Sequence, residues 1–506
     1  MPTFAERVRS ISYAELTGIR RGIEKESLRV HQDGKLATTP HPAALGSALT
    51  HPNITTDFSE AQPELVTGVH AGVEECIQEL TQIHQFLYRE IDDELLWVGS
   101  MPCGLPSDDL IPIARFGSAN VARAKSIYRI GLGHRYGRRM QTISGIHYNW
   151  SMPGVSNKEY FALIRNFRRH SFLLLYLFGA SPAVCSSFVA GREHELQSLT
   201  ESTLYTPHAT SLRMGRLGYR SDAQASLAVS YNSLESYATS LQEALTQPYP
   251  AYTAIGIRSA AGDYNQLATS LLQIENEFYG TIRPKRVIFP GERPLHALRE
   301  RGVEYIEVRC LDLDPFVDVG IGSQTVRFLD VFLLHCLVAD SPPDIPQEIA
   351  ALARNQERVA ARGREPGLGL ERGTTQIALE EWGRNVLDEC VPIAAALDGV
   401  HGGTNYSDAL TAAAAALITP SVLPAARVLS GMAKDFDNSY VRFVQARSER
   451  TKNTMLSLAF PANIEARFRR LADESHQEQQ RIEAADSMPF ESYLEKYLAT
   501  EGLQMK

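Results

Sequence analysis

The sequence predicts an α+β protein in which a sheet-containing core is followed by a mostly helical C-terminal part. In the first two thirds, short segments with alternating apolar and polar residues lie between segments whose apolar residues recur at a spacing near 3.6. After the SPPD sequence at 341–344, the composition changes to long stretches rich in Ala, Glu and Arg, including an amphipathic segment over 465–499. We therefore expect a sheet-based core over 1–345 and helices over 346–506 that pack on it, as a second part or within one structural domain.

Helical spacing is clearest in four segments of the chain. We expect helices over 73–89, 158–178, 224–245 and 326–337. The uncharged stretch 171–191 has the length of a membrane span, but Gly179 and Pro182 interrupt it. A buried helix over 172–178 followed by a loop is therefore expected, without a membrane partner.

Composition limits the function classes. The chain has 506 residues and a formal net charge of −9. An acidic protein lacks the concentrated basic face that releases counterions from nucleic-acid phosphates, so we expect no nucleic-acid partner. Six cysteines without a C-x-x-C pair, and an N-terminal segment without an apolar run, predict reduced thiols and a cytoplasmic location.

Carboxylates recur in the segments that alternate. In RRGIEKESLRV, strand alternation places Glu24 and Glu26 on the same face. The pair is either part of an exposed edge with solvated charges or a cation site, in which Mg²⁺ or Mn²⁺ relieves the repulsion. In ITTDFSEAQPELVTG, Pro63 argues against one continuous central strand, so Asp57 and Glu64 are expected as loop carboxylates.

Two further segments present polar groups on one face. QTISGIHYNWSM has a period of two that puts Gln141, His147 and Asn149 together. A histidine in a strand is often structural, but these polar neighbours also suit the floor of a polar cavity. In VEYIEVRCLDLDPF, Glu307 and Arg309 share a face opposite apolar residues, and such a face can also simply meet water as a weak exposed ion pair.

Repetition of this pattern favours a sheet-floored cavity lined with oxygen ligands. Basic residues that lie near these strands in sequence, among them Arg129, Lys285 and Arg286, can neutralise phosphate beside such a cluster. The chain has no Walker A, G-x-G-x-x-G or H-E-x-x-H sequence, which excludes the P-loop, Rossmann and zincin classes. The residues alone therefore predict a Mg²⁺-dependent enzyme that handles phosphate on a mixed sheet.

Eight segments between about residue 18 and residue 370 form a recognisable series: GIEKESLRV, TTDFSEAQPELVTG, YGRRMQTISGIHYNWS, YLFGASPAVCSSF, ATSLRMGRLGY, LQIENEFYGTIRPKR, GVEYIEVRCLDLDPF and GREPGL. In content and in order they closely resemble the proteobacterial glutamate-cysteine ligase family. Weaker similarity continues to EAADSMPFESYLEKY. The resemblance implies a glutamine-synthetase-like fold, in which a curved, mainly antiparallel sheet forms a funnel with helices outside it.

The resemblance also implies an activity, the first step of glutathione biosynthesis. ATP phosphorylates the γ-carboxylate of L-glutamate, the amine of L-cysteine attacks the acyl phosphate, and ADP and phosphate leave. Because a free carboxylate is a poor electrophile, the site must neutralise charge and position the reactants. The implied partners are glutamate, cysteine and ATP, with Mg²⁺ as cofactor and Mn²⁺ as an alternative; the oligomeric state stays open, and a monomer is compatible.

Matching motif positions assigns the site residues that the resemblance implies. The Mg²⁺ ligands correspond to Glu24, Glu26, Asp57, Glu64, His147 and Glu307. Arg309 would stabilise the transferring phosphoryl group and the tetrahedral intermediate. The amino-acid substrates would contact Phe58, Tyr128, Arg129, Arg213, Tyr219 and Tyr279, and the nucleotide would contact Gln141, Asn149, Lys285 and Arg286.

The sequence departs from the family pattern at three places. Pro63 stands where better-known members carry an aliphatic residue, the segment after Asp435 lacks their glycine-rich stretch, and the C-terminal third aligns poorly. A shifted acceptor pocket would suit another small amine, so one alternative is a γ-glutamyl ligase of a specialised pathway. An alternative of another class is an inactive ligand-binding or regulatory homologue, which the complete set of acidic positions together with Arg309 disfavours.

Overall fold

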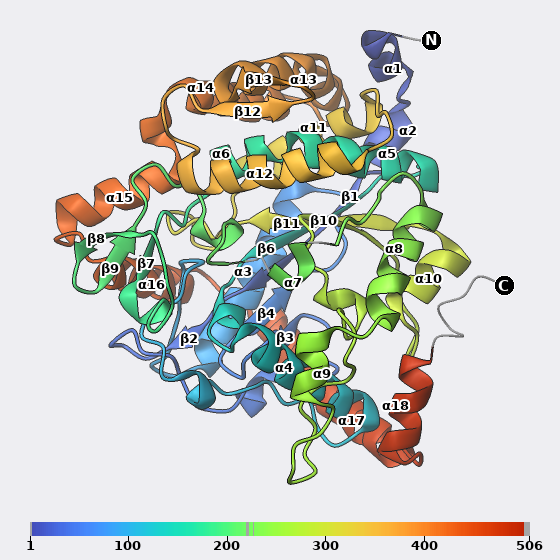
Figure 1. The fold of residues 1–506 in the computed structure, drawn as a ribbon. Coiled ribbons are helices and arrows are strands. Elements are labelled where there is room, and N and C mark those ends of the chain that lie inside the picture. Colours follow the sequence, from blue (N-terminus) through green and yellow to red (C-terminus); the bar gives the residue numbers. More distant parts are fainter. Residues whose placement is uncertain (1–2, 219–221, 226, 500–506) are drawn as a thin grey trace.

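The computed structural model describes residues 3–218, 222–225 and 227–499, and it confirms an α+β protein with antiparallel sheets (Figure 1). The largest sheet has six strands in the order β10-β11-β6-β1-β4-β3, and every neighbouring pair is antiparallel. Its strands are β1 (Arg20–Glu26), β3 (Ile54–Thr56), β4 (Pro63–Val66), β6 (Ile146–Ser151), β10 (Ile282–Lys285) and β11 (Tyr305–Leu311).

Smaller sheets and the helices complete the described chain. β2 (Arg29–Val30) and β5 (Leu95–Leu96) form a two-stranded sheet, and so do β12 (Gly369–Arg372) and β13 (Thr375–Ala378). A three-stranded sheet has β9 (Thr203–Tyr205) between β7 (Ala183–Cys185) and β8 (Gln197–Thr200). The helices are α1 (Phe4–Ser10), α2 (Tyr13–Thr17), α3 (Val73–Glu90), α4 (Asn120–Tyr136), α5 (Asn157–His170), α6 (Phe172–Phe178), α7 (Asp222–Ala225), α8 (Leu234–Thr246), α9 (Pro250–Ile255), α10 (Pro294–Arg301), α11 (Ser323–Val338), α12 (Pro346–Arg362), α13 (Leu379–His401), α14 (Asn405–Ile418), α15 (Pro424–Asp435), α16 (Tyr440–Ser457), α17 (Ala462–Ala485) and α18 (Phe490–Leu498).

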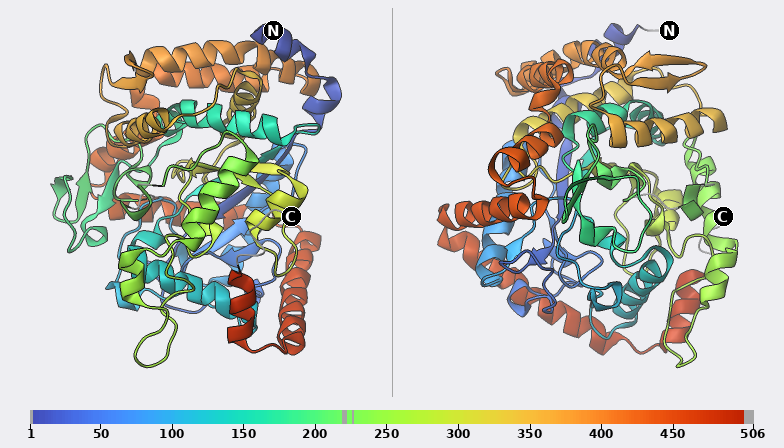
Figure 2. Two further views of the ribbon diagram at one scale, coloured as in Figure 1. Left: turned by 45° about the vertical axis from the view of Figure 1, so that its right-hand side comes forward. Right: turned by 60° about the vertical axis from the view of Figure 1, so that its left-hand side comes forward.

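Helices cover one face of the six-stranded sheet. α3 contacts β1 and β4, α5 contacts β10, and α6 contacts β11, while α11 packs on α3 and α5 (Figure 2). On this face Lys25 of β1 lies 2.6 Å from His84 of α3, and Tyr148 of β6 donates a hydrogen bond to Asp330 of α11 at 2.7 Å. Because side chains alternate along a strand, the residues next to Lys25 and Tyr148 point to the opposite face, where the polar cavity lies.

The strands correct three details of the sequence interpretation. β1 lies between β6 and β4, so Glu24 and Glu26 are not on an exposed edge. β4 begins at Pro63, a position where the missing N–H is tolerated, so Glu64 belongs to a strand and only Asp57 lies in a loop. The period of two around 141–152 holds only from Ile146, because 140–142 form a 3₁₀ turn.

The predicted helices are confirmed with shifted boundaries. The segments 73–89 and 326–337 are α3 and α11. The segment 158–178 is two helices, α5 and α6, which meet at Ser171, and α6 with the loop after it confirms the expectation for 172–178. The predicted helix 224–245 starts only at Leu234, because the Ser233 side chain caps the backbone N–H of Ser236 and ends the preceding loop.

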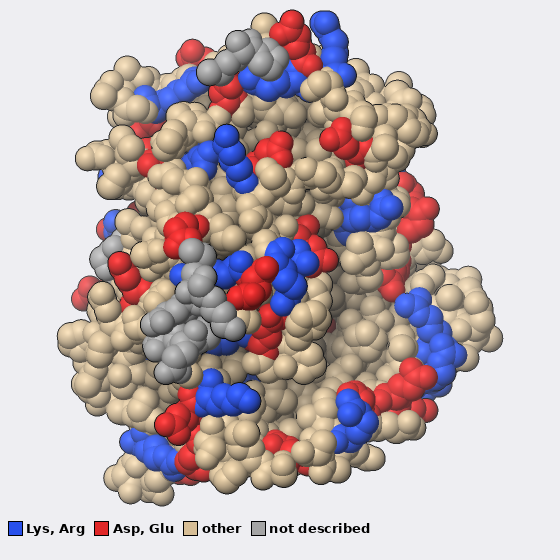
Figure 3. All heavy atoms as spheres, turned by 90° about the vertical axis from the view of Figure 1, so that its right-hand side faces the viewer, with Lys and Arg blue, Asp and Glu red and all other residues tan. Residues whose placement is uncertain are grey.

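One hydrophobic cluster spans both parts of the chain. It joins Ile23 and Val308 of the central sheet with Leu387 of α13 and Phe468 of α17. Within the described ranges, no helix is long and apolar enough to cross a membrane. On the face shown in Figure 3 the basic and acidic side chains are interspersed, and the molecule is hollowed between them.

The cysteines differ from the expectation of reduced thiols at one pair. Cys103 and Cys185 form a disulfide, with Cα atoms 5.3 Å apart. The two residues are 82 positions apart in sequence, so no spacing motif signals that the loop after β5 meets the end of β7. The remaining cysteines are buried thiols: Cys76, Cys310, Cys336 and Cys390.

Candidate active site

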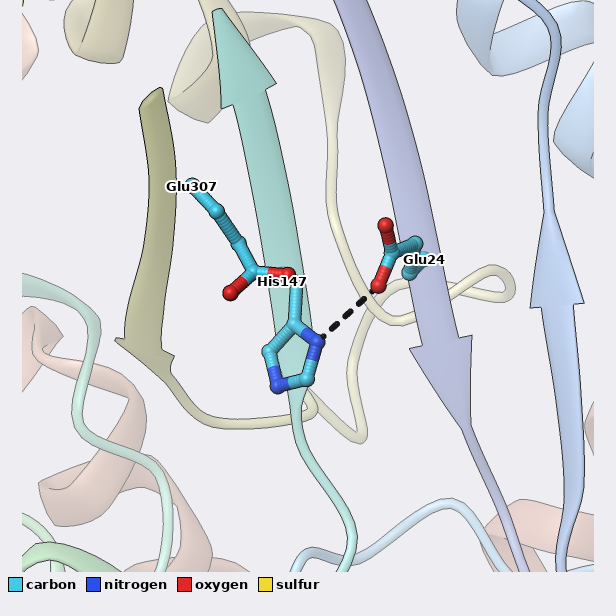
Figure 4. A group of neighbouring side chains, drawn as sticks. All are labelled: Glu24, His147 and Glu307. Atoms are coloured by element: carbon cyan, nitrogen blue, oxygen red, sulfur yellow. Dashed lines mark hydrogen bonds and ion pairs between the residues drawn. The ribbon is translucent and has the colours of Figure 1, made fainter. Parts of the chain in front are cut away.

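Three neighbouring strands bring two carboxylates and an imidazole together on the face opposite the helices. Glu24 of β1 pairs directly with His147 of β6, and Glu307 of β11 pairs with Asn149 of β6. Oε2 of Glu24 lies 3.2 Å from Nδ1 of His147, and Glu307 points to the same place from the other side of β6 (Figure 4). One ligand atom from each of Glu24, His147 and Glu307 lies within 4.8 Å of the others, a spacing that suits one cation.

A second group of three shares His147 with the first. Glu26 of β1 lies directly opposite Glu64 of β4, and ligand atoms of both come within 4.8 Å of each other and of His147. The backbone N–H of Gly145 donates to Oε2 of Glu26 at 2.9 Å, which fixes this carboxyl. Asp57, just after β3, lines the same cavity of about 340 Å³. All six acidic and imidazole residues expected as ligands therefore border one cavity.

Crowding of the carboxylates shifts their protonation. Burial and the nearby Asp57 raise the pKa of Glu26 to about 8. Burial, together with Glu24 and Asp57, raises the pKa of Glu64 well above its ordinary value. Burial also opposes ionisation of Glu307, but Lys285 and Arg309 outweigh it and hold that pKa well below the ordinary value. Glu26 and Glu64 therefore hold a proton more readily than ordinary carboxyl groups do, whereas Glu307 stays ionised.

The same cluster leaves a buried nitrogen without a protein partner. Within the described part of the chain, Nε2 of His147 has no hydrogen-bond partner, and it lies 3.9 Å from Oε1 of Glu26. Burial and Arg309 lower the pKa of His147, which favours the neutral ring that can act as a ligand. A divalent cation among these carboxylates would satisfy the nitrogen and relieve the repulsion, so the residues present fit a metal.

Two cations hold Glu307 in place. Nζ of Lys285 donates to Oε1 of Glu307 at 3.0 Å, and Arg309 donates to Oε2 at 2.9 Å. Arg213 lies behind them, fully buried, where it donates to the backbone carbonyl of Arg309 at 3.0 Å. A Cβ at Gly145 would collide with the Arg213 guanidinium, which explains the glycine at this point of the wall.

An aromatic wall adjoins the carboxylates. Phe58, Tyr128 and Tyr279 line the cavity, and Nε2 of Gln141 donates to the hydroxyl of Tyr279 at 2.8 Å. Arg129 also lines it. Tyr219, which the sequence analysis adds to this wall, lies outside the described residues.

Three expected site residues do not line the cavity. Asn149 supports it from one side by donating to Oε1 of Glu24 at 2.8 Å. Arg213 lies outside the cavity lining and donates a hydrogen bond to the backbone carbonyl of Arg309. Arg286 pairs with Glu304 at 3.4 Å and donates to the backbone carbonyl of Arg301, and among the described residues no hydrogen bond or ion pair joins it to the cluster.

The cavity also includes residues that the sequence analysis did not select. Lys125 lies one helical turn before Arg129 on α4, a spacing from which it could have been found. Arg283, which the sequence places among the basic residues near these strands without a role of its own, lies opposite Glu307 in the β10–β11 pair. Tyr493 and Tyr497 come from α18, at the far end of the chain, and no motif signals that this helix reaches the site.

Comparisons with known proteins agree with this arrangement. The family model for glutamate-cysteine ligase matches residues 8–359. The glutamate-cysteine ligase of Saccharophagus degradans is 48% identical over 503 residues, which cover 95% of this chain and 94% of that protein. The enzyme of the same name from Alcanivorax borkumensis is 46% identical over 506 residues, with 96% of each chain covered.

Solved structures give the same result. The crystal structure of glutamate-cysteine ligase from Francisella tularensis in complex with AMP has a TM-score of 0.91 at 36% identity, covering 96% of this chain and 99% of that one. A bifunctional glutathione synthetase from Pasteurella multocida has a TM-score of 0.68 at 26% identity, covering 88% of this chain and 53% of that one. Similarity that extends over nearly the whole chain, in sequence and in fold, shows that the protein belongs to the glutamate-cysteine ligase family.

Proposed function

We propose that the protein joins the γ-carboxylate of L-glutamate to the amine of L-cysteine in an ATP-dependent reaction, the first step of glutathione biosynthesis. One observation carries the proposal. In a chain of this family, the carboxylates on β1, β4 and β11 converge on one cavity beside Lys285 and Arg309, which is what a phosphoryl-transfer site requires. AMP bound to the Francisella relative supports an adenine nucleotide as the phosphoryl donor.

The chemistry has two steps. An oxygen of the glutamate γ-carboxylate attacks the terminal phosphorus of ATP, and the bond to ADP breaks. The cysteine nitrogen then attacks the carbonyl carbon of the γ-glutamyl phosphate and loses a proton, and phosphate leaves. Arg309 is the catalytic residue, because Glu307 holds its guanidinium at the cluster, where its planar fork suits phosphoryl oxygens and the oxyanion of the tetrahedral intermediate.

The ligands proposed for Mg²⁺, or Mn²⁺, are Glu24, Glu26, Asp57, Glu64, His147 and Glu307. The two sets of close ligand atoms and the raised pKa values of Glu26 and Glu64 support this assignment. The ion supplies positive charge to the polyphosphate when bound. Lys285, which also lines the cavity, would add positive charge, and we assign Lys285 with Gln141, Asn149 and Arg286 to nucleotide binding.

The acceptor pocket is proposed for the aromatic wall. Phe58, Tyr128 and Tyr279 would enclose the cysteine side chain, with Tyr219 as a further member, and Arg129 would lie near its carboxylate. Arg213 is assigned to glutamate binding, which it would support through the Arg309 backbone.

The wider setting follows from the same assignment. We propose that the antiparallel sheet with its helical cover forms the funnel of the glutamine synthetase fold. We also propose that residues 1–345 act as the catalytic core with 346–506 packed on it, and that the enzyme works in the cytoplasm, where ATP and its amino-acid substrates occur together. No nucleic-acid or membrane partner is proposed.

ADP release measured against a panel of amines tests the proposal. We expect release to require glutamate, cysteine and a divalent cation together, with γ-glutamylcysteine identified by mass spectrometry. A preference for a larger or charged amine would replace cysteine as the acceptor and retain the ligase chemistry. Absence of ADP release with every amine in the panel would contradict the proposal in favour of an inactive homologue.

A further inference from the structure

Asp312 is a buried carboxylate directly after β11, where three of the segments that resemble the family meet. Its Oδ2 accepts the backbone N–H of Ala180 at 2.8 Å and the hydroxyl of Ser181 at 2.6 Å, and its Oδ1 accepts the hydroxyl of Ser211 at 3.0 Å. Oδ1 also lies 3.8 Å from the guanidinium of Arg213, and neither of these two side chains is exposed. Because a buried carboxylate is costly unless it is paired and hydrogen-bonded, Asp312 and Arg213 belong to one buried unit.

Ser211 links this carboxylate to the turn that carries Arg213. The Ser211 hydroxyl oxygen accepts the backbone N–H of Met214 at 3.3 Å and so caps the 3₁₀ turn Leu212–Met214. The same hydroxyl donates to Asp312. Asp312 therefore holds Arg213 in two ways, through the backbone of its turn and through opposite charge beside its side chain.

Arg213 in turn reaches β11 at an irregular point of the strand. The register between β11 and β6 shifts between Val308 and Leu311, where β11 has one residue more than its partner. Such a bulge interrupts the regular ladder and changes the direction of the side chains beside it. Arg309 lies in the bulge, and Arg213 donates to its backbone carbonyl at 3.0 Å. The backbone that directs the Arg309 side chain is thus held by Arg213.

The Arg213 guanidinium also supports the metal-ligand cluster from behind. It lies directly against Gly145, since a Cβ at this glycine would come within 2.0 Å of it. The backbone N–H of Gly145 donates to Glu26 at 2.9 Å. One guanidinium therefore connects Asp312 with the carbonyl of Arg309 and with the backbone that fixes Glu26.

We propose that Asp312 is a positioning residue for phosphoryl transfer, which acts through Arg213 to aim the guanidinium of Arg309. The inference rests on the proposed function and extends its machinery to a layer behind the cavity, which Asp312 does not line. Without the charge of Asp312 every group that meets a substrate is still present, but Arg309 is no longer held in place. A misplacement of about 1 Å can cost on the order of 10²-fold in rate, so the effect belongs to kcat.

Asp312→Asn tests the role of this charge. The hydroxyls of Ser181 and Ser211 can turn to accept from the new amide group, so we expect the variant to fold. We expect kcat to fall by about 10- to 100-fold, the range for partners behind a site, while KM for ATP and for cysteine changes by less than about threefold. ADP release over a range of each substrate gives these constants, and thermal unfolding shows that the variant is folded.

A double-mutant cycle separates positioning from a structural role. In Arg213→Met, Asp312 has no cation left to hold, so adding Asp312→Asn should change kcat by less than about twofold. The double variant should also unfold at a higher temperature than Arg213→Met, because it no longer buries an unpaired carboxylate. If Arg213→Met does not fold or has no measurable turnover, Ser211→Ala takes its place in the cycle, and its loss in kcat should likewise not add to that of Asp312→Asn.

Asp314→Asn is the matched control two residues further along the chain. The Asp314 carboxylate accepts the backbone N–H of Phe316 at 2.9 Å within a local turn, so this variant should keep kcat within about twofold. Three results would overturn the inference: a kcat near the wild-type value in folded Asp312→Asn, a loss that appears only in KM, or an Asp312→Asn effect of the same factor in both backgrounds of the cycle. If the wild-type protein releases no ADP with cysteine, the proposed function itself fails, which is a distinct outcome.

Discussion

Glu24 and His147 are direct partners across the antiparallel β1–β6 pair, with Oε2 of the carboxylate 3.2 Å from Nδ1 of the ring. The strand register alone brings them together, although they are 123 residues apart in sequence. A shift of one residue would turn Glu24 and Glu26 into the helical layer and bring Lys25 to the cavity. The buried contact of Lys25 with His84 opposes that shift, so the core on one face fixes the cluster on the other.

The first prediction concerns Glu307. Replacement by Gln removes the negative charge with little change in volume, and it leaves Lys285 and Arg309 without the carboxylate that holds them. We expect the Glu307→Gln variant to fold normally and to lose ligase activity by about 10²-fold or more, the scale for one electrostatic group in a site of this kind. ADP release at saturating Mg²⁺ measures the loss, and calorimetric titration measures the affinity for Mn²⁺.

A matched control lies on α13, outside the cavity. Glu380 is exposed and pairs with Arg384, so Glu380→Gln removes the same charge from an exposed ion pair that does not line the cavity. It should retain activity within about twofold, as is usual for an exposed ion pair. Near-normal turnover of the Glu307→Gln variant at saturating Mg²⁺ would contradict the assignment of Glu307 as a metal ligand.

The second prediction separates chemistry from nucleotide binding at Arg309. Arg309→Lys keeps the positive charge but loses the planar fork that spans two phosphoryl oxygens. If this contact tightens mainly in the transition state, kcat should fall by about 10²-fold while KM for ATP changes little. Initial rates over a range of ATP concentrations give both constants. A variant with unchanged kcat and a raised KM would place Arg309 in ground-state nucleotide binding.

Period-two patterns made part of the site predictable. Glu24 with Glu26, His147 with Asn149, and Glu307 with Arg309 each share a strand face, and alternation alone shows this. Register between strands is a long-range property, so the meeting of these faces became an expectation only through resemblance to a family. Alternation alone does not show where a strand begins. Gln141 continues the period-two pattern of the sequence, but it lies in the 3₁₀ turn at 140–142, outside the strand.

Other features depend on tertiary contacts that leave little trace in sequence. Tyr493 and Tyr497 reach the cavity because α18 packs on α4, although more than 350 residues separate the two helices. The same holds for the Cys103–Cys185 disulfide, which joins the loop after β5 to the end of β7. Lys125 is an exception, because its helical spacing from Arg129 was present in the sequence.

The third prediction concerns stability and His51, which is buried near the N-terminal end of β3. Its Nδ1 accepts hydrogen bonds from the backbone N–H of Asn53 at 3.1 Å and of Ile54 at 2.9 Å. Burial, with a smaller effect of His476, lowers its pKa from 6.5 to about 4. As the pH falls, His51 therefore binds a proton in the unfolded chain before it does so in the folded protein. The contribution of His51 to the free energy of unfolding is fully present above about pH 6.5 and is lost as the pH falls toward 4.

His51→Asn tests this dependence, because the Asn oxygen replaces Nδ1 as an acceptor and does not titrate. From the two pKa values, the proton uptake of His51 costs the wild type about 2 kcal/mol at pH 5 relative to pH 7, which the variant avoids. Urea unfolding at both pH values should therefore show a smaller loss in the variant. His31→Asn, at an exposed position, serves as control and should follow the wild type. Equal losses in His51→Asn and the wild type would contradict the assignment.

The last prediction concerns the acceptor side chain. Phe58 is held in the turn between β3 and β4, where its carbonyl accepts from Ala114 N–H at 2.9 Å and the turn closes through Asp57 N–H and Gln62 O at 2.9 Å. These bonds do not involve Pro63, so none of them depends directly on the residue at that position.

A compact aromatic wall favours a polarizable sulfur or an ethyl group, while a serine hydroxyl would lose water contacts there. We therefore expect the order cysteine, then 2-aminobutyrate, then alanine and serine in kcat/KM. Apolar pockets discriminate by about 10- to 200-fold over a methylene-sized difference, so 2-aminobutyrate should be slowed and still used. Competition between pairs of amines, with products separated by mass, measures the order. If serine equals 2-aminobutyrate, the pocket must present a polar partner for the hydroxyl, and the wall formed by Phe58, Tyr128 and Tyr279 would not set acceptor choice.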